Sequence, residues 1–133
     1  MCALAILLAL LPWYSHHLQT EALRHAELGE QVKSLHVAER TVSVNPLSMQ
    51  ARFVLAGAQQ RVGRTVEARR TLVSAVEMQP LNYEGWLQLA LYERDRWGES
   101  ERAREHFAIA ISLNPYDDHL QVEAGVKDVE DLE

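Results

Sequence analysis

The sequence predicts an all-α protein built from a repeated pair of helices. Its prolines are 34, 34 and 35 residues apart, and glycines follow the first three prolines by 17, 17 and 18 residues. These residues are Pro12, Pro46, Pro80 and Pro115, with Gly29, Gly63 and Gly98 between them. A period of about 34 residues is the length of one helix–turn–helix unit in a stacked solenoid. Apart from short valine runs, no segment alternates with the period of two that a strand requires.

The prolines and glycines are expected to separate the helices. Proline lacks an amide donor and ends a helix, whereas glycine tolerates the left-handed backbone of a tight turn. Each repeat therefore runs as helix, glycine turn, helix and proline. Residues that cap helix N-termini stand two positions after most of these marks: Ser48, Asn82 and Asp117 after prolines, and Thr65 and Ser100 after glycines. The first repeat is weaker because Tyr14 and Gln31 occupy those positions.

The candidate core lies in columns that recur in each repeat. Residues 30–46, 64–80 and 99–115 align without a gap as the second helices. Small residues let paired helices approach closely, and larger residues fill the space between repeats. The columns are Ser34, Ala68 and Ala103; Ala38, Leu72 and Phe107; Thr41, Ala75 and Ala110; and, in the first helices, Ala22, Ala56 and Ala90.

The third repeat has an aromatic residue, a leucine and a small residue, followed by alanine, phenylalanine, alanine and proline. These are Trp86, Leu89, Ala90, Ala103, Phe107, Ala110 and Pro115. In this order they resemble the tetratricopeptide repeat (TPR) signature. The second repeat is similar, with Leu55, Ala56, Gly63, Ala68, Leu72, Ala75 and Pro80. The pattern departs from the family where Arg52 and Leu18 replace the large aromatic and Glu93 replaces a tyrosine.

The resemblance implies a right-handed TPR superhelix of antiparallel helix pairs, with about three repeats. An apolar helix precedes the repeats and a capping helix follows them. The expected divisions are an apolar segment over 1–12, a degenerate first repeat over 13–46, a second repeat over 47–80, a third over 81–115, and an acidic capping helix and tail over 116–133. A polar terminal helix covers the last exposed repeat of a solenoid. The tail holds seven acids against Lys127 alone, and we expect a solvated tail from about Lys127 onward.

The N-terminal segment is apolar without interruption from Cys2 to Leu11, and Trp13 and Tyr14 follow Pro12. We interpret it as the last half of a transmembrane helix with these aromatic residues at the interface, because a spanning helix needs about 20 apolar residues. The alternatives are a poor signal anchor, or a helix buried against the first repeat through Leu4, Leu7, Leu8 and Leu11. Localisation is therefore predicted as membrane-associated, otherwise cytoplasmic. The arrangement resembles the C-terminal TPR tail of bacterial O-antigen ligase-type membrane proteins.

The sequence gives no indication of catalysis, and we expect no enzyme, no cofactor and no metal site. A single cysteine excludes a cysteine-based zinc site, and the six histidines are dispersed. The glycines are isolated rather than gathered in a phosphate-binding loop, and the carboxylates are expected at exposed helix positions. Overall acidity, with a net charge of −6, disfavours nucleic-acid binding.

What remains is a binding surface. The TPR resemblance implies that the first helix of each repeat lines a concave groove for a protein or peptide. The predicted partner-binding residues are Gln19, Leu23, Phe53, Gln60, Arg61, Leu87, Leu91 and Arg94, with Ala26 and Gly57 on the same strips. Alternatively, these residues pack against neighbouring helices or a capping segment. The lysine and asparagine set that clamps a terminal carboxylate in some TPR domains is missing, because Gln19 and Leu23 occupy its first places.

The predicted function is a non-catalytic protein-interaction scaffold, tethered at a membrane through residues 1–14. The alternative is a C-terminal accessory domain of a polytopic membrane O-antigen ligase or glycan polymerase. The second repeat carries five arginines against Glu67 and Glu77, which suits an acidic partner or the chain's own tail.

Overall fold

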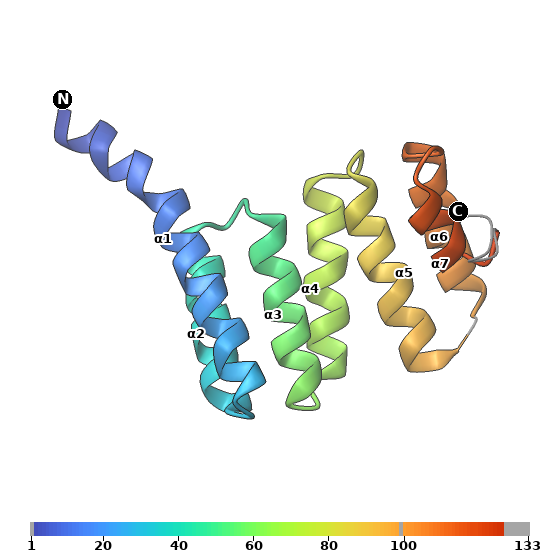
Figure 1. Cartoon of the computed structure of the whole chain (residues 1–133), viewed down its shortest axis with the longest axis horizontal. Coiled ribbons are helices and arrows are strands. Elements are labelled where there is room, and N and C mark those ends of the chain that lie inside the picture. The colour runs from blue at the N-terminus through green and yellow to red at the C-terminus, as the bar shows by residue number, and fades with distance from the viewer. Residues whose placement is uncertain (1, 99, 127–133) are drawn as a thin grey trace. The chain divides into compact units, whose positions relative to one another are not determined.

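The computed structural model describes residues 2–98 and 100–126, and only the backbone of residues 2–11 and of residue 97. These described residues form helices and turns but no strand (Figure 1). The helices are α1 (Cys2–Glu27), α2 (Gln31–Val44), α3 (Met49–Arg61), α4 (Thr65–Met78), α5 (Tyr83–Trp97), α6 (Glu101–Leu113) and α7 (Asp118–Glu123). The predicted all-α fold of helix pairs is confirmed.

The chain divides into two compact units, and the division falls within α4. Unit 1 comprises Met1–Thr71 and unit 2 comprises Leu72–Glu133. In unit 1, α2 packs against both α1 and α3, and α1 also contacts α3. In unit 2, α5 pairs with α6, and α6 contacts the short helix α7. Each unit therefore has its own set of packed helices.

The turns between paired helices follow the glycine pattern. Gly29, Gly63 and Gly98 have positive φ angles of 75°, 80° and 74°, which is the left-handed conformation that glycine adopts without a side-chain clash. The side chains of Ser48 and Ser100 accept hydrogen bonds from backbone amides at the starts of α3 and α6. Asn82 and Asp117 do the same for α5 and α7. The predicted caps at these four positions are confirmed.

Three of the prolines lie in turns that are stabilised by a side chain six residues further along the chain. Arg52 and Trp86 donate hydrogen bonds to the carbonyl oxygens of Pro46 and Pro80, and Gln121 donates to that of Pro115. At these three positions a long side chain with an N–H donor therefore makes the same contact, whether or not it is aromatic. Leu18, at the matching position after Pro12, has no such donor.

Pro12 lies inside α1, so the prediction that it ends a helix is wrong. Proline in a helix removes one backbone hydrogen bond, but its fixed φ is compatible with helical geometry. Here it follows a run rich in alanine and leucine, which are strong helix formers, and no side chain at position 18 can hold a turn. The expected boundary between an apolar segment and the first repeat after residue 12 stays a prediction.

The cores of both units use the predicted columns. In unit 1, Ala22, Leu35, Ala38, Val54 and Ala58 form a buried cluster. In unit 2, Ala90, Phe107, Ala110 and Leu120 form another. Every member of the four aligned columns is buried, from the small residues to Phe107. The register deduced from the sequence is therefore the register of the packing.

The capping helix α7 covers the end of unit 2. Asp117 begins it, and Leu120 is only 1% exposed in the cluster with Phe107. Val122 is half-buried, whereas Val126 is exposed and contributes little to packing. The acidic tail expected from Lys127 onward lies outside the described residues.

Candidate functional site

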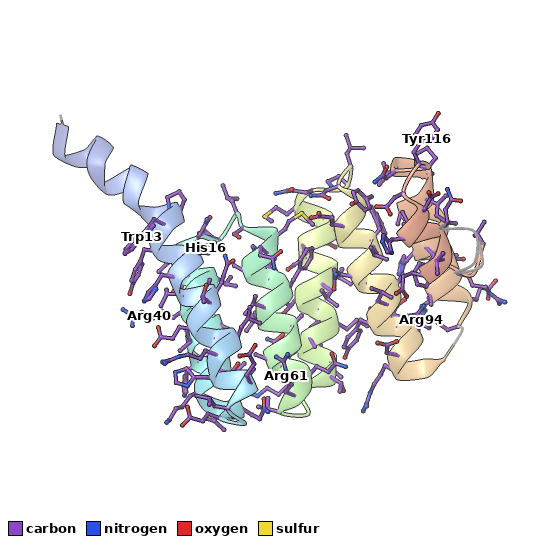
Figure 2. The ribbon with its side chains drawn as sticks, viewed as in Figure 1. Trp13, His16, Arg40, Arg61, Arg94 and Tyr116 are labelled. Atoms are coloured by element: carbon purple, nitrogen blue, oxygen red, sulfur yellow. The ribbon has the colours of Figure 1, made fainter. Side chains whose placement is uncertain are left out.

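The candidate partner-binding surface of unit 1 comes from α1 and α3. On α3, Phe53, Gly57 and Arg61 are spaced four residues apart and so share one side of the helix. Phe53 is half-buried, whereas Gln60 and Arg61 are exposed. Figure 2 shows Arg61 at the C-terminal end of α3. We call these four residues the α3 strip.

The matching residues of α1 are Gln19 and Leu23. Leu23 is 42% exposed. Gln19 is half-buried, and its amide group donates a hydrogen bond of 3.4 Å to the Ser15 hydroxyl. Because α1 and α3 contact each other, both sets of residues belong to one packed unit.

Gly57 lies in the middle of α3 although its packing does not require a glycine. Its φ is not positive, and a Cβ atom built at this position would meet only the terminal Nη1 of Arg61, at 3.6 Å. That distance is an ordinary van der Waals contact. Glycine in a helix interior costs about 1 kcal/mol relative to alanine. The α3 strip therefore includes a destabilising residue with no reason inside the described fold.

The α5 residues predicted for partner binding are engaged within unit 2. Leu87 and Leu91 are half-buried and pack against the cluster that contains Phe107 and Leu120. Their side chains thus contribute to the core of the unit. This is the arrangement expected under the alternative in which the groove residues contact a capping segment.

Arg94 on α5 binds the capping helix directly. Its Nη1 donates to the Glu123 carbonyl oxygen at 2.7 Å, and its Nη2 donates to Glu123 Oε2 at 2.9 Å. The guanidinium carbon lies 5.5 Å from the centre of the Phe107 ring, within cation–π range. The hydrogen bond with Glu123 raises the pKa of Arg94 above its ordinary value. Arg94 is therefore a clamp that fastens α7 to α5.

One carboxylate contradicts the expectation that carboxylates occupy exposed helix positions. Glu93 is only 1% exposed, and its Oε2 lies 2.9 Å from His106 Nδ1. The His106 ring also contacts Trp86, with ring centres 5.5 Å apart. A hollow of about 320 Å³ borders Glu93 at the turn before α6. The sequence carries a signal for this burial, because Glu93 occupies a position at which the TPR pattern has a tyrosine.

Two further expectations concern metals and membranes. Among the described residues, no group of three or more histidine, cysteine, aspartate or glutamate side chains is arranged to hold a metal ion. Within that same part of the chain, no helix combines the length and apolar composition needed to cross a bilayer. The packing stripe expected from Leu4, Leu7, Leu8 and Leu11 falls on side chains that the structure does not describe.

Comparison with solved structures places the fold among TPR proteins. YrrB, a TPR protein with an unusual peptide-binding site, superposes with a TM-score of 0.68 at 20% identity, over 84% of this chain and 56% of YrrB. The chain thus spans little more than half of YrrB. The Sgt2 TPR domain from Aspergillus fumigatus gives a TM-score of 0.70 at 18% identity, over 84% of this chain and 75% of that domain.

A third similar structure was determined with a bound peptide. The first TPR domain of Spaghetti (RPAP3), bound to the HSP90 peptide SRMEEVD, has a TM-score of 0.67 and 14% identity, over 84% of this chain and 87% of that domain. No family model and no curated protein matches the sequence. The structural similarities establish that this chain has a TPR fold.

Proposed function

We propose that this protein is a non-catalytic interaction module that binds an extended peptide of a partner protein across α1 and α3 of unit 1. The observation that carries the proposal is Gly57. A glycine that costs helix stability, at a position where an added Cβ atom would meet only the flexible end of Arg61, is suited to a site where a ligand backbone approaches closely. The peptide-binding sites reported for YrrB and for the RPAP3 domain support the same use of this fold.

The residues around Gly57 indicate what a peptide would contact. Phe53 and Leu23 offer apolar surface, and Gln19 and Gln60 offer amide groups for hydrogen bonds with a peptide backbone. Exposed Arg61 adds a positive charge at one end of the α3 strip. In unit 2, a peptide that used Leu87, Leu91 and Arg94 would have to displace α7. We therefore place the site on unit 1 and treat the α5 residues as accessible only after α7 has been released.

The accessory role in a membrane glycan ligase has no observation in its favour, and we do not propose it. The similar structures show the TPR fold and carry no indication of this role.

The test is to select peptides from a random library on the full chain and to measure their affinities by calorimetry. Gly57→Ala should raise the free energy of unfolding by about 1 kcal/mol and yet weaken binding about tenfold, since an added methyl group would separate the peptide from the helix. A glycine with no role in binding would show the rise in stability without the loss of affinity. Phe53→Ala should also weaken binding, whereas Leu91→Ala, on α5, should not. If no peptide is selected, or if Gly57→Ala binds as tightly as wild type, the proposal is wrong.

A further inference from the structure

The first half of α1 extends beyond the helix with which α1 is paired. α1 has 26 residues and α2 has 14, and the two are joined by the short turn at Gly29. The paired length of α1 is therefore its second half. Figure 1 shows the first turns of α1 continuing past the end of α2, with no other helix of unit 1 alongside.

This protruding segment is apolar on every side. From Cys2 to Leu11 it contains only cysteine, alanine, leucine and isoleucine. A helix that packs on one partner needs a single apolar stripe, whereas a helix that is apolar all round requires an apolar environment around its whole circumference. A second copy of the chain would cover one side of the segment. Lipid would surround it.

Aromatic and apolar side chains are exposed where the segment joins unit 1. Trp13 (Figure 2) is 68% exposed, and its ring stacks on the His17 ring, with ring centres 6.0 Å apart. Leu47, in the turn between α2 and α3, is 72% exposed. Tryptophan and tyrosine gather at the level of lipid headgroups, because their rings are apolar and their edges form hydrogen bonds.

The charges of unit 1 suit an anionic surface. No acidic residue occurs in residues 1–20 or in residues 40–66. Arg40 places its guanidinium carbon 5.8 Å from the centre of the Tyr14 ring, and Arg52 donates to the carbonyl of Pro46 beside Leu47. Two arginines therefore lie close to the exposed apolar residues, and no carboxylate occurs in these parts of the sequence. Basic residues near a membrane strengthen binding to anionic lipid.

We propose that unit 1 binds an anionic lipid surface, with Cys2–Leu11 inserted into the hydrocarbon layer and with Trp13, Leu47, Arg40 and Arg52 at the headgroup level. This proposal is independent of peptide binding, because it uses the end of α1 that precedes Gln19.

The experiment is flotation of the full chain with vesicles of phosphatidylcholine, with or without phosphatidylglycerol. Wild type should float with the anionic vesicles, and Leu8→Glu and the double variant Trp13→Ala/Leu47→Ser should remain behind. Arg40→Gln/Arg52→Gln should weaken anionic-vesicle binding by about fivefold for each arginine while retaining weak binding to the neutral vesicles. Circular dichroism establishes that each variant retains its helices.

Unit 2 provides a matched control. Leu81 and Tyr116 also directly follow prolines and are 84% and 92% exposed, but acidic residues follow them closely in the sequence. Leu81→Ser/Tyr116→Ser should float as wild type does. The proposal is overturned if wild type does not float, or if Leu8→Glu floats equally well. It is also overturned if wild type is a dimer that does not bind vesicles and Leu8→Glu converts that dimer to monomers. A second copy of the chain, rather than lipid, would then cover the apolar segment.

Discussion

Units 1 and 2 share one packing scheme but differ in their surfaces. Unit 1 carries eight lysine and arginine residues against five acidic residues, a net charge of +3. Unit 2 carries five lysine and arginine residues against fourteen acidic residues, a net charge of −9. In unit 2, Arg94 on α5 is bound to α7, whereas the α3 strip of unit 1 includes exposed Gln60 and Arg61. The same helix pair therefore serves as a closed end in unit 2 and as a candidate recognition surface in unit 1.

The largest expected effect tests the shared packing. Ser34 and Ala103 occupy the same column in the two units, and each is 1% exposed. Ser34→Leu and Ala103→Leu should each lower the free energy of unfolding by about 1–3 kcal/mol, because an added side chain overpacks a helix–helix contact. Ala26→Leu, at a half-buried position on α1, should cost much less. Denaturant unfolding measures all three, and equal losses at Ala26 and Ala103 would show that the register is wrong.

A smaller effect tests the closed end of unit 2. Arg94→Ala removes both hydrogen bonds to Glu123, but the side chains are partly exposed, so the expected cost is about 1 kcal/mol. Amide hydrogen exchange should accelerate at Ala124 and Gly125, whose amides bond to carbonyls of α7. Arg96→Ala, an exposed arginine on the same helix, serves as the control. Unchanged exchange in Arg94→Ala would mean that Leu120 alone holds α7.

The smallest expected effect is a difference between the two units in how their stability depends on pH. Hydrogen bonds from Lys33 and then His25 lower the pKa of Glu30 in unit 1, so this carboxylate stabilises the fold above its unfolded pKa and ceases to do so as pH falls. Burial, followed by the neighbouring Asp117, raises the pKa of Tyr83 in unit 2. Protonated Tyr83 therefore stabilises the fold fully below the unfolded-state pKa of about 10, and this stabilisation is lost as the pH rises through the folded-state pKa. Thermal unfolding across pH should show that Glu30→Gln flattens the acid limb and Tyr83→Phe the alkaline limb; unchanged limbs would contradict these assignments.

The sequence predicted the fold well because the repeat makes each position visible three times. Ala22, Ala56 and Ala90 are individually ordinary, but as a column they predict a close helix contact, and all are buried. The glycine turns and the four helix caps were also predictable, because they depend on local backbone chemistry. The prediction for Pro12 was wrong because the fixed φ of proline is compatible with helical geometry and the residues before Pro12 are strong helix formers. Leu18 cannot form the hydrogen bond that Arg52, Trp86 and Gln121 provide.

The candidate site was less predictable, because its character depends on contacts between segments distant in the sequence. The Arg94–Glu123 clamp joins residues 29 positions apart, and it gives a predicted groove residue a structural partner. The burial of Glu93 depends on His106 from the next helix. The TPR resemblance places Gly57 on a helix expected to line the groove, but only the coordinates show that an added Cβ atom there would meet nothing closer than Arg61 Nη1, at 3.6 Å.

Gly57 also has a consequence for attempts to engineer this chain. A screen for heat resistance, or a redesign guided by helix propensity, would favour alanine at position 57 among its first choices, because the substitution fits and strengthens α3. If the glycine accommodates a ligand backbone, the engineered protein would be more stable but would bind its ligand less tightly. Stabilising substitutions should therefore be sought at exposed positions away from the α3 strip.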